Sequence, residues 1–63
     1  MKLERTRANV FTLTGTSQEL AALVAAARLA RDAMLDDPNA PAEAIRVLER
    51  VIADYDAALK RLR

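Results

Sequence analysis

The two prolines of the chain, Pro38 and Pro41, constrain its fold more than any other feature. Pro38 removes a backbone hydrogen-bond donor and disfavours helical geometry at Asp37, and Asn39 beside it favours a turn. Apolar residues recur at helical spacing on both sides of this break, so two helices are predicted. A short turn makes them antiparallel neighbours. The predicted elements are helices over residues 16–35 and 42–62 and a turn over residues 36–41.

The first predicted helix has a clear start signal and a wide apolar surface. Thr16-Ser17-Gln18-Glu19 fits a capping box, in which the Thr16 hydroxyl accepts from the Glu19 amide while the Glu19 carboxylate reaches back. An N-cap at Ser17 is the alternative. One apolar stripe comprises Leu20, Leu23, Ala27, Ala30 and Met34, and a second comprises Ala22, Ala26, Leu29 and Ala33. A single neighbouring helix cannot cover both stripes, so we expect burial on more than one side.

The second predicted helix carries a heptad seam of about three repeats, typical of a coiled coil. The seam residues alternate at spacings of three and four: Ile45, Leu48, Ile52, Tyr55, Leu59 and Leu62. We expect Pro41 in the first turn, where a missing N–H does no harm. Glu43 near the start and Lys60 and Arg61 near the end suit the helix dipole.

The N-terminal segment, residues 1–14, is predicted to be a strand or arm. Within Val10–Thr14, Phe11 and Leu13 fall on one face, and Val10, Thr12 and Thr14 fall on the other. A lone strand has no partners for its backbone hydrogen bonds, so we expect it to pair with a copy of itself or with another protein. The alternative is a frayed arm.

Size predicts self-association. The chain has 63 residues, and 14 of its hydrophobic residues are alanines, which bury little area. A chain of about 60 residues buries only about 60% of its unfolded surface, and this one has no cysteine for a disulfide. We therefore expect a homo-oligomer, most simply a two-fold dimer. The predicted interface residues are Val10, Phe11, Leu13, Leu20, Leu23, Ala27, Ile45, Leu48, Ile52, Tyr55 and Leu59.

The predicted fold class is mainly α, in one domain over residues 1–63. A short N-terminal β-strand precedes an antiparallel helical hairpin, and a dimeric four-helix core with paired strands completes the fold. The formal net charge is only +1, yet the hairpin predicts two charged poles. The turn pole carries Asp32, Asp36, Asp37 and Glu43 against Arg31 and Arg46. Candidates for binding anions or nucleic acid near the opposite pole are Lys2, Arg5, Arg7, Thr12, Thr14, Lys60, Arg61 and Arg63.

Catalysis has few candidate residues. The sequence has no Cys and no His, so it offers no thiol nucleophile, no imidazole base and no usual zinc ligands. Asp36, Asp37 and Asn39 could hold a hard cation, but they lack the pattern of the twelve-residue calcium loop. We expect no enzyme, no cofactor and no metal. Without a membrane-spanning run or a signal-peptide core, we expect a cytoplasmic location and no membrane partner.

Val10-Phe11-Thr12-Leu13-Thr14, followed by a capped helix with Leu20 and Leu23, resembles the ribbon-helix-helix DNA-binding family. The resemblance covers about residues 8–27. It implies that strands from two subunits pair, with Phe11 and Leu13 facing the core and the alternate residues facing DNA. Asp36-Asp37-Pro38 departs from the family, which has a phosphate-contacting turn near that place. We therefore expect a non-catalytic oligomeric interaction protein that binds another protein or an anionic ligand, and a DNA-binding regulator is the alternative.

Overall fold

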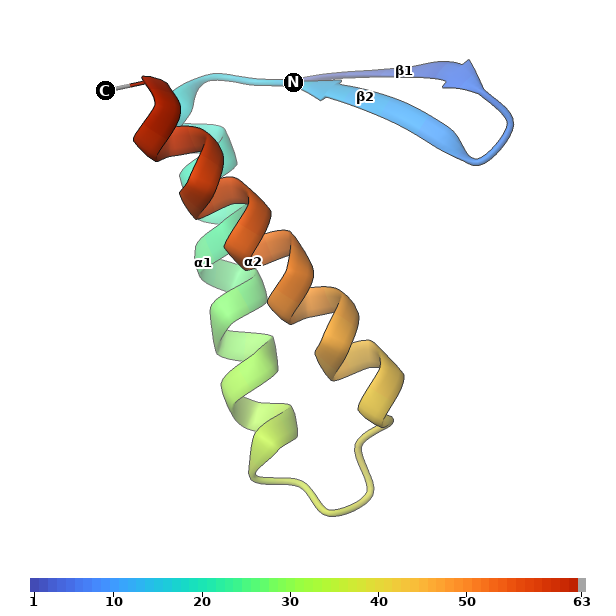
Figure 1. Ribbon diagram of the computed structural model, residues 1–63, viewed down its shortest axis with the longest axis vertical. Helices are drawn as coiled ribbons and strands as arrows, with labels where there is room; N and C mark the ends of the chain where they lie inside the picture. Colours follow the sequence, from blue (N-terminus) through green and yellow to red (C-terminus); the bar gives the residue numbers. More distant parts are fainter. Residues whose placement is uncertain (63) are drawn as a thin grey trace.

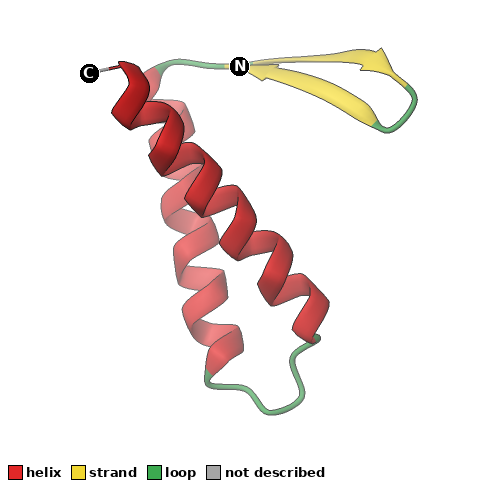
Figure 2. Cartoon of the chain, viewed as in Figure 1, coloured by secondary structure: helices red, strands yellow, loops and turns green. Residues whose placement is uncertain are grey.

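The computed structural model describes residues 1–62 and consists of two hairpins, one of strands and one of helices (Figures 1 and 2). The strands are β1, Lys2–Arg7, and β2, Val10–Thr14. The helices are α1, Ser17–Leu35, and α2, Ala42–Leu62. The predicted, mainly helical architecture with an antiparallel helical hairpin is therefore confirmed.

The N-terminal segment differs from the prediction of a single strand. β1 and β2 pair antiparallel within the chain, with Leu3 opposite Leu13 and Arg5 opposite Phe11. Asn9 turns the chain between them in the left-handed region, with φ 67°, which asparagine tolerates better than most residues. The Thr6 hydroxyl donates to the Val10 carbonyl across this turn, 3.0 Å away. The expectation that Val10–Thr14 needs a second chain for its hydrogen bonds was wrong, because β1 supplies a partner.

Local signals explain where the helices start and end. Thr16 is the N-cap of α1, and the predicted capping box is confirmed: the Glu19 amide donates to the Thr16 hydroxyl at 3.1 Å, and the Thr16 amide donates to the Glu19 carboxylate at 2.8 Å. In the turn, the Asn39 amide donates to the Asp37 carboxylate at 2.9 Å. Pro41 lies just before α2 rather than in its first turn, and its carbonyl accepts from the Ile45 amide.

The core lies between the two helices and is very small. Of residues 1–62, only Val24 of α1 and Ile52 of α2 are buried, with 8% and 4% of their surfaces exposed. The only helix-to-helix contact among the described residues is that between α1 and α2, so these two side chains lie at that contact. Two buried side chains are few for a folded domain, so most of the apolar surface of both helices remains open.

The strand hairpin projects sideways from the end of the helix pair where both termini lie (Figure 1). Within residues 1–62, strands contact strands and helices contact helices, and the two hairpins meet around Met1. The N-terminal ammonium lies 3.4 Å from the Glu19 carboxylate. A Cβ on Gly15 would lie 3.2 Å from the Met1 side chain, so glycine permits this close approach. Among the described residues, no helix has the length and apolarity needed to cross a membrane.

Candidate interaction site

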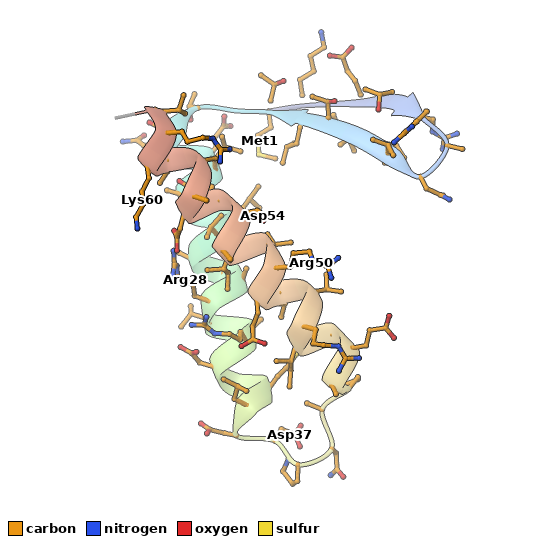
Figure 3. The ribbon with its side chains drawn as sticks, viewed as in Figure 1. Met1, Arg28, Asp37, Arg50, Asp54 and Lys60 are labelled. Atoms are coloured by element: carbon orange, nitrogen blue, oxygen red, sulfur yellow. The ribbon has the colours of Figure 1, made fainter. Side chains whose placement is uncertain are left out.

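An ion pair identifies the polar side of the helix pair. An Arg28 guanidinium nitrogen donates to the Asp56 carboxylate at 2.7 Å, linking α1 to α2. At about 100° per residue, Arg28 lies about 40° to one side of buried Val24, and Asp56 lies about 40° to one side of buried Ile52. Because Arg28 contacts Asp56, the side of α1 that carries Arg28 and the side of α2 that carries Asp56 form one face of the helix pair. Arg28 and Arg50 point to opposite sides of the helix pair in Figure 3.

The opposite face of the helix pair is apolar, and we call it the open face. Its members lie about 40–120° from Val24 or Ile52 on the side away from the ion pair. They include Leu23, Ala27, Ala30 and Met34 of α1 and Leu48, Val51 and Tyr55 of α2. Leu23 and Val51 are 45% and 47% exposed, and the others are half-buried. A continuous apolar face of this kind is typical of an interaction surface.

The strand hairpin has an apolar face of its own, which we call the ribbon face. Leu3 lies directly opposite Leu13, and Phe11 lies two residues before Leu13 on the same strand, so the three side chains share one face. All three are exposed, Phe11 at 51%. The Arg5 guanidinium lies 5.3 Å from the centroid of the Phe11 ring, a cation–π distance. The ribbon face therefore carries its own positive charge.

The other side of the strand hairpin is polar. Lys2 lies opposite Thr14 and Glu4 lies opposite Thr12, so the threonines expected to face DNA lie beside a lysine and a carboxylate. Lys2 and Glu4 form an exposed ion pair at 3.6 Å. Arg7 lies at the tip, opposite Val10. This side offers hydroxyl, ammonium and guanidinium donors to an anionic partner, with one carboxylate among them.

The charges separate along the molecule. Lys60 lies toward the end where the termini meet, and Asp37 lies in the turn at the far end (Figure 3). Arg61 is in the last turn of α2, and Asp36 caps α1 at the turn. The strand hairpin adds its three cationic side chains to the first end. Arg63, the remaining predicted cation, lies outside the described residues.

The predicted interface residues fall into three groups. Ile52 is buried between the helices of one chain. The half-buried group comprises Leu20, Ala27, Ile45, Leu48 and Tyr55, and the exposed group comprises Val10, Phe11, Leu13, Leu23 and Leu59. The sequence interpretation missed Leu3, because β1 has one apolar residue among polar ones and so carries a weak strand signal. It also missed the Arg28–Asp56 pair, whose members are 28 positions apart.

Three other acidic side chains have defined partners. The Asp37 carboxylate holds the turn through the Asn39 amide, and Asp56 binds Arg28 rather than facing Asp54. The Thr16 backbone N–H, with smaller contributions from the N-terminal ammonium and the Thr16 hydroxyl, holds the pKa of Glu19 below its usual value of 4.5. Within residues 1–62 no cluster of three metal-ligating side chains and no pocket is found.

Comparison of the chain with protein families, with curated proteins and with solved structures found no match. The two apolar faces and the two charged ends described above are therefore the features that a function of this chain has to use.

Proposed function

We propose that this protein is a non-catalytic, self-associating interaction module, most simply a homodimer in which two open faces pack into a four-helix core. The dimer displays the strand hairpin and the basic end to a partner protein or an anionic ligand. The observation that carries the proposal is the excess of exposed surface. The chain exposes 5287 Å², whereas a compact monomer of 6.9 kDa exposes about 4,000 Å².

The excess, about 1,300 Å², is larger than the surface that each partner commonly loses in a stable interface, about 800 Å². The shape agrees with this estimate: the radius of gyration is 13.3 Å, against about 10.6 Å for a compact domain of this length. The open face is apolar, so its burial between two copies would supply the hydrophobic free energy that two buried side chains cannot. In a symmetric dimer both copies contribute the same face, and each helix pair has one open face to contribute.

The test places a charge on each side of α2. Val51 is on the open face, and Ala53 is exposed and lies about 100° from Ile52 on the side of the ion pair. In sedimentation equilibrium, Val51→Glu should raise the dimer dissociation constant about 100-fold or more, because it buries an unpaired carboxylate. Ala53→Glu inserts the same side chain into the same helix and should change the constant less than about threefold.

A compact wild-type monomer whose melting temperature does not depend on concentration would overturn the proposal. Equal effects of Val51→Glu and Ala53→Glu would overturn the choice of the open face.

The second candidate is a DNA-binding regulator, favoured by the exposed two-stranded ribbon. A β-ribbon fits the major groove of DNA, and this one carries Lys2, Arg5 and Arg7 against a single acid, Glu4. The ribbon-helix-helix family builds its ribbon from two subunits, whereas here both strands belong to one chain. Because one side of the ribbon is apolar, the residues that would face the groove are those of its polar side, including Thr12 and Thr14.

Fluorescence anisotropy with random duplex DNA, in a series of salt concentrations, tests this candidate. Arg7→Ala should weaken binding of every sequence and reduce the salt dependence by about one counterion. Thr12→Ala should weaken binding without changing the salt dependence. No rise in anisotropy at low salt would exclude the candidate.

A further inference from the structure

We propose that the two copies pack antiparallel and exchange their strand hairpins, so that the ribbon face of each copy covers the turn end of the open face on the other. This arrangement rests on the proposed self-association and specifies its orientation. The partner is a second copy of this chain, and the contacts are reciprocal because the dimer is symmetric.

Charge complementarity is the first argument. The strand hairpin carries Lys2, Arg5 and Arg7, and the turn end carries Asp36 and Asp37, both exposed. A parallel dimer would place like charges side by side at both ends, whereas an antiparallel dimer places each basic end beside an acidic one. Arg5 lies on the same face as Phe11, so its positive charge would lie beside the apolar contact with the second copy.

Shape and connection supply the second argument. The strand hairpin leaves its own helices sideways (Figure 1), and the link of Gly15 and Thr16 is fixed by the capping box. Five or six residues of strand span about 17–20 Å, which matches the width of two helices lying side by side. In an antiparallel dimer the hairpin therefore lies at the level of the partner's turn and can cross both helices there. Met34 and Leu48 of the open face lie in the halves of α1 and α2 that are next to the turn.

The stability of the strand hairpin is the third argument. A two-stranded hairpin alone in water is marginally stable, and it needs a further surface to cover its apolar side. Leu3, Phe11 and Leu13 find no such surface within residues 1–62 of their own chain. The turn end of the open face on a second copy offers an apolar surface with carboxylates beside it.

The experiment reverses charges at the two ends and measures dimer dissociation constants by sedimentation at low salt. The ribbon variant is Arg5→Gln with Arg7→Glu, and the turn variant is Asp36→Lys with Asp37→Asn, which keeps an oxygen for the Asn39 amide. Each should weaken the dimer about tenfold, because two attractive contacts per dimer become repulsive. The four substitutions together restore attraction and the wild-type net charge, so the constant should return to within about threefold of wild type.

Glu49→Lys with Asp54→Asn is the matched control, since it changes the net charge as the turn variant does but at exposed sites on the middle of α2. It should change the constant less than about threefold. A wild-type dimer that the ribbon and turn variants leave unaffected would overturn the exchange while leaving self-association intact. That result, with DNA affinity lost in the ribbon variant, would assign the hairpin to nucleic acid instead. A monomeric wild type would overturn both proposals.

A second measurement uses the absence of cysteine from the sequence. An isotope-labelled Arg7→Cys chain is mixed with an unlabelled Asp36→Cys chain and oxidised gently, and the cross-linked species are identified by mass. Antiparallel exchange predicts that links between positions 7 and 36 of different chains predominate. A predominance of links between two copies of position 7 would show a parallel dimer. Yields equal to those of an Arg50→Cys control would also contradict the arrangement.

Discussion

The strand hairpin and the helical hairpin are both antiparallel pairs, yet they are held together in different ways. α1 is capped at both ends, and the two helices share an interhelical ion pair and two buried side chains, Val24 and Ile52. All residues of the two strands are exposed, and their pairing depends on ladder hydrogen bonds, cross-strand contacts and one turn. The helices therefore have a nucleus of their own, whereas the strands bury no side chain within residues 1–62, as expected of a marginally stable two-stranded hairpin.

The two hairpins would therefore respond differently to loss of the proposed dimer partner. The backbone hydrogen bonds of a helix lie within the helix, so the helix pair would lose chiefly apolar contacts if the proposed dimer dissociated. The strand hairpin would lose the surface on which its order depends. Changes in the helix core should consequently affect the whole fold, and changes in the ribbon should affect the ribbon and the dimer.

The largest effect is expected at Ile52, the most buried residue described. Ile52→Ala should lower the free energy of unfolding by about 2–4 kcal/mol, because it removes three carbons from the centre of the helix contact. Ile52→Asp should leave a carboxylate there and unfold the chain and dissociate it together. Circular dichroism during urea unfolding, at two protein concentrations, measures both variants. A folded, soluble Ile52→Asp monomer would contradict the shared role of this core.

The next effect is expected at Asn9, which tests whether the strands are independent of the helices. Asn9→Val should cost about 1–2 kcal/mol in ribbon stability, because a β-branched residue fits poorly at φ 67°. Asn9→Gly, the matched control, accepts this conformation. Hydrogen exchange should show lost protection in β1 and β2 of Asn9→Val while α1 and α2 keep theirs at a concentration where both variants are dimeric. Equal loss in the helices would show that the two hairpins form one cooperative unit.

The helical hairpin could be predicted from the sequence because its signals are local. Thr16 and Glu19 mark one helix start, Pro38 marks the break, and the spacing of Ile45 and Ile52 gives the face that packs. The signs of the charges at the two ends followed from the antiparallel turn. These inferences needed only the helical period and the geometry of capping.

The strand pair and the open face could not be predicted in the same way. Leu3 is the only apolar residue in β1, and Asn9 lacks the following glycine that marks many hairpin turns, so the turn signal is weak. Which flank of each helix stays open depends on the rotation of α1 against α2. That rotation is apparent only from contacts such as the one between Arg28 and Asp56, which no sequence period specifies.

A smaller effect is expected at the junction of the two regions. Thr16→Ala should lower the free energy of unfolding by about 1 kcal/mol, because the Glu19 amide loses its acceptor at the start of α1. Ser17→Ala is the control and also tests the alternative cap: Ser17 is the first residue of α1, so its loss should cost less than about 0.5 kcal/mol. Equal costs in thermal melts would contradict the assignment of the cap to Thr16.

The smallest effect concerns Glu19, which joins the two regions through Met1 and Thr16. Its lowered folded pKa means that its contribution to stability is present above the unfolded value of 4.5 and is lost as the pH falls through the folded value. Glu19→Gln keeps an oxygen for the Thr16 amide but cannot titrate, so the variant should lose less stability than wild type between pH 5 and pH 3. Urea unfolding across that range measures the difference, and the other carboxylates contribute equally to both proteins. Identical pH profiles would contradict the lowering of the Glu19 pKa by the Thr16 amide and the N-terminal ammonium in the folded protein.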